Sequence, residues 1–393
     1  MIAWPFRPNW STPYQHRYEF LTELIVSDSG REQRRALRVA ARRTIEYAIM
    51  ETAERFRAVR RTIARMHESV IFADEPLRTY LSATGASGGY TIALTIAPSW
   101  VRAGGKLVLW DAATKAVVVH TVFAVSGLTA TLVEPLDRTW PTDTLVMCGL
   151  AGRLAADLKP TYRTDAMVEL TVSLEVDPGT EFEDAGTAIT TFNGREVFLH
   201  PANWSQAIEI PTTNPVEWVD PGMGVRAAFR QINFLTEIRQ SLHRIKTTSD
   251  VNQIVGLFLR SRGRQGEFYL PSGLQDIVPT LSVSSGGRFW RVAGHDFCDA
   301  YDDSTVHRAF CVTLASGATL FFRVVNIVTG GTTDPYSEIE TVETAPYAIA
   351  PADVVRASWM PAARFATDDL VVKWLTDGFA EVVLNLQTLE DLP

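Results

Sequence analysis

The residue types best suited to chemistry in this chain are two histidine–cysteine pairs. His295 and Cys298 are separated by two residues, and His307 and Cys311 by three. Imidazole nitrogen and thiolate sulfur are common ligands of zinc. The spacing matches no standard zinc module, however, and both cysteines follow phenylalanines in apolar stretches, where reduced cysteines commonly pack in a core. Core packing is the favoured interpretation, a metal site is the weak alternative, and no cofactor is expected.

Acidic residues form a second set with chemical potential. Asp299, Asp302 and Asp303 could supply oxygen ligands to calcium, but they lack the alternating spacing and turn glycine of an EF-hand. Adjacent carboxylates such as Asp368 and Asp369 are more often solvated or capping than catalytic. The chain contains no Walker-type phosphate loop and no HExxH motif. We therefore expect no catalytic centre and no enzymatic activity.

Arginines are concentrated at the start of the chain. Residues 1–70 contain 13 arginines and 8 acidic residues, a net charge of +5, whereas the whole chain carries −8, so the remainder carries −13. This asymmetry is typical of a basic interface, although a solvated or salt-bridged surface is the commoner explanation. The residues that we assign to an oligomer interface or channel are Arg31, Arg34, Arg35, Arg38, Arg42 and Arg43.

Length and composition predict an ordered protein of two units. The chain has 393 residues, of which 46% are hydrophobic and 21% charged, enough apolar material for substantial cores. The three cysteines are odd in number and lack CxxC spacing, which argues against a disulfide scaffold and fits a reducing compartment. No apolar run approaches the length of a membrane span, and no signal peptide is evident.

Two short segments recur in the same order. Residues 20–24 (Phe-Leu-Thr-Glu-Leu) resemble residues 234–238 (Phe-Leu-Thr-Glu-Ile), and residues 153–157 (Arg-Leu-Ala-Ala-Asp) resemble residues 364–368 (Arg-Phe-Ala-Thr-Asp). The first segment precedes the second by 133 residues in one half (153 − 20) and by 130 in the other (364 − 234). A repeat of this period predicts one structural unit used twice, as in symmetric or pseudo-symmetric assemblies.

The periodicity predicts the same order of elements in both halves. In the first half, strands are expected at 18–26 and 32–50 and a helix at 52–67, because apolar residues there change from alternation to steps of three and four. A short strand at 69–73, a β-rich insert and a closing hairpin follow. In the second half, Ser249 is expected to cap a helix that buries Val251, Ile254, Val255 and Phe258.

The resulting fold class is mainly β with few helices (α+β). We expect two units of hairpin, helix and hairpin, each with an inserted small β-sandwich or barrel. The predicted domains are a first unit at 1–76 and 148–177, its insert at 77–147, a linker at 178–215, a second unit at 216–280 and 358–393, and its insert at 281–357.

Several stretches resemble a known group of proteins. They are Trp4-Pro5, Pro8-Asn9-Trp10, residues 20–24 and 29–38, and the C-terminal residues 364–370 and 374–377. These stretches resemble tail-tip proteins, of distal tail or baseplate hub type, from long-tailed bacteriophages and prophages. The order hairpin, helix, hairpin is also similar to the tail-tube fold of that family.

The resemblance implies a structural ring around the DNA channel that connects the tail tube to the hub or fibres. It implies assembly in the bacterial host cytoplasm and a final location in the virion, at the tail tip. The implied partners are further copies of the chain, the tail tube protein, the tape measure protein, hub or fibre proteins, and DNA that passes without specific contact. Two units per chain favour a trimer with pseudo-sixfold symmetry over a hexamer of two stacked rings.

Two other classes of function stay open at this point. Aromatic residues of the inserts could stack on sugars in a receptor- or carbohydrate-binding baseplate module. A cell-wall-cleaving tail enzyme is the less favoured alternative, because it requires a paired-carboxylate cleft or a Cys/His site. The aromatic residues considered for sugar binding are Trp100, Trp110, Trp140, Tyr301 and Tyr336.

Overall fold

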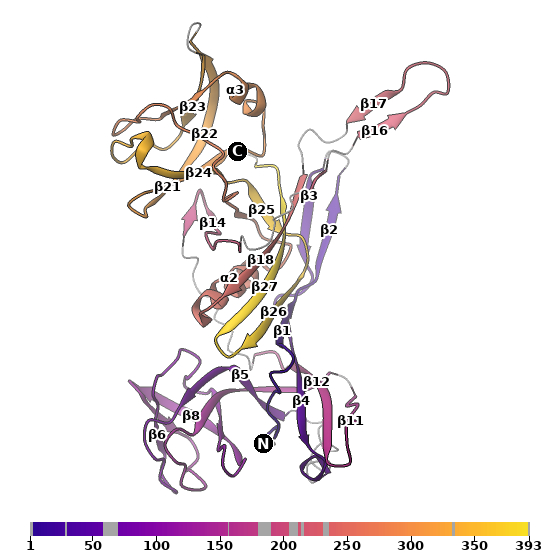
Figure 1. The fold of residues 1–393 in the computed structure, drawn as a ribbon, viewed down its shortest axis with the longest axis vertical. Helices are drawn as coiled ribbons and strands as arrows, with labels where there is room; N and C mark the ends of the chain where they lie inside the picture. The colour runs from indigo at the N-terminus through magenta and orange to yellow at the C-terminus, as the bar shows by residue number, and fades with distance from the viewer. Residues whose placement is uncertain are drawn as a thin grey trace.

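The computed structural model confirms a mainly β fold. It describes residues 3–27, 30–57, 70–155, 157–179, 190–203, 211–213, 216–230, 236–331 and 335–391. The molecule is elongated, with the first half and its insert at one end and the second insert at the other (Figure 1). Between them, strands from both halves form one continuous antiparallel sheet in the order β12, β4, β1, β26, β27 and β18.

The first half supplies twelve strands within the described residues. Helical residues 53–57 follow β4. The strands are β1 (Tyr14–Glu19), β2 (Thr22–Val26), β3 (Glu32–Ala36), β4 (Arg42–Thr52), β5 (Val70–Tyr80), β6 (Thr91–Ala93), β7 (Lys106–Trp110), β8 (Val117–Ser126), β9 (Thr129–Leu132), β10 (Leu145–Leu154), β11 (Thr161–Tyr162) and β12 (Met167–Val176).

The remaining elements belong to the linker and the second half. They are β13 (Thr191–Phe192), β14 (Arg195–Val197), β15 (Thr212–Thr213), β16 (Val216–Val219), β17 (Ala227–Arg230), β18 (Thr236–Ile245), α2 (Thr248–Ser261), β19 (Phe268–Tyr269), β20 (Phe289–Ala293), α3 (Asp296–Tyr301), β21 (Ala309–Leu314), β22 (Thr319–Gly330), β23 (Tyr336–Thr341), η1 (Pro351–Asp353), β24 (Val354–Trp359), β25 (Ala362–Phe365), β26 (Asp369–Thr376) and β27 (Phe379–Thr388).

The two halves pair their strands in the same order. In the first half β4 lies between β1 and β12, and β12 also pairs with β10 and β11. In the second half β18 lies between β15 and β27, and β27 also pairs with β25 and β26. The strands β1, β4 and β12 of one half therefore have the same neighbours as β15, β18 and β27 of the other.

The match extends to single residues. Thr22 is opposite Ala36 in the hairpin β2–β3, and Val216 is opposite Arg230 in the hairpin β16–β17. Equivalent residues of the two hairpins therefore differ by 194 in residue number, on both strands (216 − 22 and 230 − 36). Gly30 and Gly224 hold the same turn position, with φ of 81° and 106°, a conformation that glycine adopts without strain. For the closing strands the shift is 211 to 212, since Arg153 is opposite Glu175 and Arg364 opposite Gln387.

This register corrects one of the two sequence markers. Residues 20–24 lie where β1 leads into β2, whereas Thr236 opens β18, the counterpart of β4. The structural counterpart of Thr22 is Val216. The similarity of residues 20–24 to 234–238, of which Phe234 and Leu235 lie outside the described residues, is therefore not a structural correspondence. The second marker does fall on equivalent strands, β10 and β25.

The other helices and strands predicted from the sequence are partly confirmed. The helix with Val251 and Phe258 on its buried face is confirmed as α2, but its N-cap is Thr247 rather than Ser249. The strand expected at 32–50 is broken into β3 and β4, because residues 37–41 leave the hairpin before the sheet begins. The strand expected at 69–73 is longer, β5. Of the helix expected at 52–67, residues 53–57 are helical and 58–67 lie outside the described residues.

The two inserts differ in how they join the body. In the first, β7 pairs with β10, so the insert extends the main sheet and shares its core. In the second, the order β20, β23, β22, β21, β24 forms a separate five-stranded sheet. Trp290, Phe310, Phe322 and Trp359 build a core of its own there. The second insert is therefore the more independent unit.

A buried polar cluster lies beside the junction of the two halves. Arg43 Nη2 donates to Asp74 Oδ2 at 2.6 Å, and Tyr14 OH donates to Oδ1 at 3.3 Å. His16 Nε2 lies 2.8 Å from the same Oδ1 and must donate to it, because a carboxylate only accepts. Burial would raise the pKa of Asp74, but His16 and Arg43 lower it to about 2.

The linker is anchored on the second half at a histidine pair. His200 Nδ1 lies 3.2 Å from His243 Nδ1, and Asn203 N donates to Leu242 O of β18. Phe198 packs edge-on against the His243 ring. Burial, and then the neighbouring His200, lowers the pKa of His243 to about 4. The neutral imidazole is therefore the form that this contact requires.

Replacing Asp74 with asparagine should destabilise the fold by about 3–5 kcal/mol, because the buried Arg43 loses its counter-charge. The measurement is urea denaturation at pH 7. Asp369→Asn is the control, since Asp369 pairs with Arg17 on the surface and should cost less than about 1 kcal/mol. Equal effects of the two substitutions would contradict the importance of the buried cluster.

Acidification should weaken the fold through His243. Its pKa is lower in the folded chain than in the unfolded chain, so the unfolded chain binds more protons. The contribution is fully present above pH 6.5 and is lost as the pH falls towards 4, by up to about 3 kcal/mol. Urea denaturation at pH 7.5 and 4.5 measures it. His243→Gln should show a smaller difference between these pH values, and an unchanged difference would contradict this origin.

Candidate assembly surface

One face of the six-stranded central sheet is uncovered and largely polar, although Met50, Val383 and Ile238 are also exposed on it. Alternate side chains of each strand point into the core, and the others remain at the surface. On β12, for example, Val168, Leu170 and Val172 are buried, whereas Glu169, Thr171 and Ser173 are not. The surface residues of the other strands include Thr44 and Glu46 of β4, Gln15 and Arg17 of β1, Val371 and Lys373 of β26, Glu381 and Asn385 of β27, and Gln240 and Arg244 of β18.

Charges on this open face alternate across the strands. In one row Glu46, Gln15, Lys373, Glu381 and Arg244 lie opposite one another on five consecutive strands. Arg244 Nε donates to Glu381 at 2.8 Å in this row. Opposite charges on neighbouring strands stabilise a sheet locally. The open face is therefore close to charge balance and is not the basic surface that binds nucleic acid.

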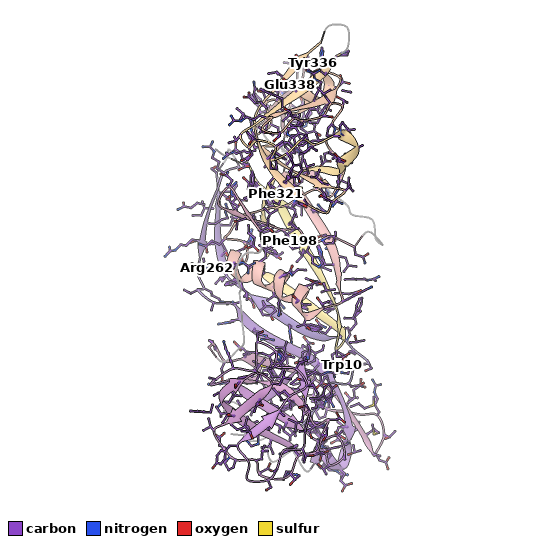
Figure 2. The ribbon with its side chains drawn as sticks, turned by 90° about the vertical axis from the view of Figure 1, so that its left-hand side faces the viewer. Trp10, Phe198, Arg262, Phe321, Tyr336 and Glu338 are labelled. Carbon is purple, nitrogen blue, oxygen red and sulfur yellow. The ribbon has the colours of Figure 1, made fainter. Side chains whose placement is uncertain are left out.

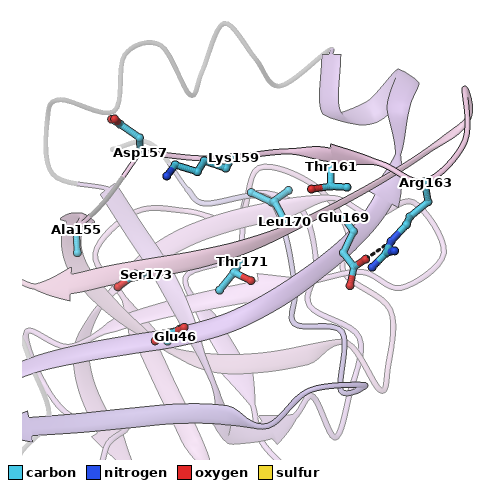
Figure 3. A pocket seen from close by; sticks show the side chains of 10 residues that line it. All are labelled: Glu46, Ala155, Asp157, Lys159, Thr161, Arg163, Glu169, Leu170, Thr171 and Ser173. Carbon is cyan, nitrogen blue, oxygen red and sulfur yellow. Dashed lines mark hydrogen bonds and ion pairs between the residues drawn. The ribbon is translucent and has the colours of Figure 1, made fainter.

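The sheet has a free edge at β12. Here β11 pairs with Val168 and Glu169, and β10 pairs with residues 174–176, so no strand pairs with the part of β12 between them. A groove of about 920 Å³ lies along this gap (Figure 3). Arg163 Nε donates to Glu169 at 2.6 Å at one end of it. The groove is lined by Glu46, Ala155, Asp157, Lys159, Thr161, Arg163, Glu169, Leu170, Thr171 and Ser173.

The opposite end of the sheet is also an edge. There β15 pairs with β18 through Thr212 and Thr213, and among the described residues no strand lies beyond it. Its counterpart in the first half, β1, pairs with β4 on one side and with β26 on the other. The edge of β15 thus corresponds to the position where β1 meets β26.

The arginines predicted from the sequence do not act as one group. Arg43 is buried in the Asp74 cluster, so its assignment to an interface was wrong. Arg34 is partly buried and forms ion pairs with Glu32 and Glu267 of the same chain. Of the remaining four, Arg31 pairs with Glu390, Arg38 with Glu19 and Arg42 with Glu175, and Arg35 is exposed on β3.

The histidines and cysteines of the second insert are not brought together. His295 Nε2 lies 3.0 Å from Gly330 O, and His307 Nδ1 lies 2.8 Å from Ser304 Oγ. Cys298 packs in the core around Trp290, whereas Cys311 belongs to a different apolar cluster, with Met360. Within the described residues no group of three or more metal-ligating side chains converges.

The aromatic residues considered for sugar stacking are mostly in the core. Trp100, Trp110 and Trp140 are buried, so they were wrongly considered as an exposed platform. Tyr301 packs against Phe297 and Trp359, and Tyr336 against Arg291. Residues 85–89 have GxSxG spacing but form a turn between strands, not a strand-to-helix elbow.

No protein-family model matches the chain, and the search of curated proteins finds no significant match. Among the described residues, none of the helices has the length and apolar composition needed to cross a membrane.

The candidate surface consists of the open face of the central sheet and the two sheet edges that flank it.

Substitutions on the two faces of β26 should have opposite consequences. Lys373 is exposed on the open face, and its neighbour Trp374 is buried. We expect Lys373→Ala to change the free energy of unfolding by less than about 0.5 kcal/mol and Trp374→Ala to cost about 3–5 kcal/mol. Urea denaturation of both variants measures this. A large cost for Lys373→Ala would show that the open face is covered in the folded chain.

Proposed function

We propose that this protein is a structural ring component of a bacteriophage tail tip, which surrounds the DNA channel between the tail tube and the hub or fibres. The single observation that carries the proposal is the joint between β1 and β26. It unites two equivalent half-sheets inside one chain and leaves the corresponding strands, β15 and β11, at the two free edges. The same joint can therefore be repeated between chains.

The internal joint specifies the register of the external one. Tyr18 is opposite Leu370 and Glu19 opposite Asp369. Shifts of 194 and 212 residues convert the first pair to Thr212 and Leu158 (18 + 194 and 370 − 212), and the second to Thr213 and Asp157. Residues 212–213 of one chain should then run antiparallel to residues 157–158 of the next. Of these, Asp157 lines the groove at the free β12 edge.

A head-to-tail joint of this kind closes into a ring when its rotation allows. Ring closure also removes both exposed sheet edges, which otherwise promote uncontrolled aggregation. The two half-sheets of one chain lie side by side in one sheet, and not as separate layers (Figure 1). This arrangement favours three chains with six half-sheets in one ring over two stacked rings.

The open face would line the channel of such a ring. Its alternating charges leave no basic surface to hold phosphates, which suits a channel that DNA must leave. The inserts lie towards the two ends of the elongated molecule (Figures 1 and 2), where they can contact the hub, fibres or a host receptor. The tail tube protein, the tape measure protein and the hub or fibres are the proposed neighbours along the channel.

Cysteines placed at the proposed joint test it. In the double variant Thr212→Cys, Leu158→Cys, oxidation should link chains covalently, because directly opposed residues of antiparallel strands lie within disulfide reach. Background is low, since Cys148, Cys298 and Cys311 are buried and burial raises the pKa of Cys148 to about 12 and of Cys311 to about 11. Thr212→Cys with Thr161→Cys, three positions out of register, is the matched control.

The expected product is a closed trimer, identified by native mass measurement and by a covalent ladder that ends at three chains. A ladder that ends at six would support a hexameric ring instead. Chains that stay monomeric at all concentrations and form no cross-link would overturn the proposal.

A further inference from the structure

The two equivalent hairpins of the chain are in different environments. Figure 1 shows β2–β3 lying along the second half, whereas β16–β17 projects away from the body. Their registers correspond residue by residue at a shift of 194. What the first hairpin contacts therefore indicates what the second is shaped to contact.

The first hairpin is held on the second half by one of its faces. Arg364 binds Glu32 through two hydrogen bonds of 2.7 and 2.6 Å, and Arg34 pairs with Glu267. Asp368 accepts from Thr22 N at 2.6 Å and from Thr22 Oγ1 at 2.9 Å. Thr22, Glu32 and Arg34 lie on the same face, because paired residues two positions apart along a hairpin point to the same side.

The counterpart face of the second hairpin carries an exposed tryptophan beside the Asp220–Arg226 ion pair. The positions of Leu24 and Arg34 are taken by Trp218 and Ala228, which lie opposite each other. Trp218 is 65% exposed. Among the described residues, β16 and β17 pair only with each other. The turn is ordered by Asp220, which binds Arg226 at 2.9 Å and accepts from Gly222 N. An aromatic side chain so presented on an ordered hairpin is typical of a binding surface.

We propose that the hairpin β16–β17 is an arm that lies on the first half of the next chain, with its Trp218 face against the surface around Arg153 and Asp157. Arg153 is the counterpart of Arg364, to which the first hairpin binds, and Asp157 lies next to it where the shift between the halves changes from 211 to 212 residues. The occupant of the surface is a second copy of this chain. The inference rests on the proposed ring and adds a second contact to its strand joint.

The charges explain why the attraction at this outer contact cannot come from the counterpart ion pair. The counterpart of the Glu32–Arg364 ion pair would bring Arg226 close to Arg153, two like charges. Each is already neutralised by its own partner, Arg226 by Asp220 at 2.9 Å and Arg153 by Asp177 at 3.6 Å. Attraction at the outer contact therefore has to come from burial of Trp218.

The opposite face of the same hairpin offers a matched control. Phe229 is paired with Glu217, so it points away from the Trp218 face, and it is 55% exposed. We expect Trp218→Ser to weaken assembly of the full chain at least about tenfold and Phe229→Ser less than about threefold. Sedimentation over a concentration series measures both. Because both side chains are exposed, thermal unfolding of the monomers should be unchanged.

A second readout locates the arm. The variant Arg226→Cys, Arg153→Cys, treated with a short bis-maleimide, should link neighbouring chains, because the counterpart side chains Glu32 and Arg364 are in contact. If the Thr212–Leu158 disulfide forms but Trp218→Ser assembles normally and the bis-maleimide links nothing, the arm is wrong and the ring stands. If Phe229→Ser is as damaging as Trp218→Ser, the assigned face is wrong. If neither cross-link forms, the ring and the arm both fail.

Discussion

The antiparallel pairing of β1 with β26 is the constraint on which the rest of this structure depends. Six residues of the first half, from Tyr14 to Glu19, run beside six of the second, and they convert two half-sheets into one. Backbone groups in a sheet need partners, and this joint provides them at one pair of edges only. The other pair of edges is the outer side of β11 and the outer side of β15, and no described strand pairs with either. The outer edges of the sheet therefore still need pairing partners, and the outer edges of further chains can supply them in the same way as β26 does for β1.

The joint also fixes the two faces of the sheet. Because side chains alternate along each strand, a common register across β12, β4, β1, β26, β27 and β18 places every buried residue except Ala48 on one side. That side carries the apolar core under α2 and the Asp74 cluster, whose ions compensate one another. The other side carries alternating charges at no comparable cost, since these remain in water. A polar surface and a packed core are thus two consequences of a single register.

Sequence patterns predicted the parts of this fold that depend on local periodicity. The spacing of Val251, Ile254 and Phe258 identified α2, and alternation identified most strands and the β-rich inserts. The correspondence between the halves was harder to find, because at the true shift of 194 residues Glu23/Glu217 and Gly30/Gly224 are the only identical pairs across residues 14–52. A five-residue similarity at another shift was more visible and was wrong. The assignment of Arg43 failed for a related reason, since nothing local in the sequence reveals that Asp74 lies opposite it.

The difference between the two hairpins bears on the symmetry of the proposed assembly. If both contacts around the ring were chemically alike, six separate single-unit chains would serve equally well. Here the inner contact uses ion pairs, Arg364 with Glu32 and Arg34 with Glu267, whereas the outer one presents Trp218. Charged pairs within a chain form without loss of translational entropy. Contacts between chains must offset that loss, and they benefit more from apolar burial. Alternation of the two kinds of contact reduces sixfold symmetry to threefold, and a threefold ring is the form that can join a sixfold tube to a trimeric fibre.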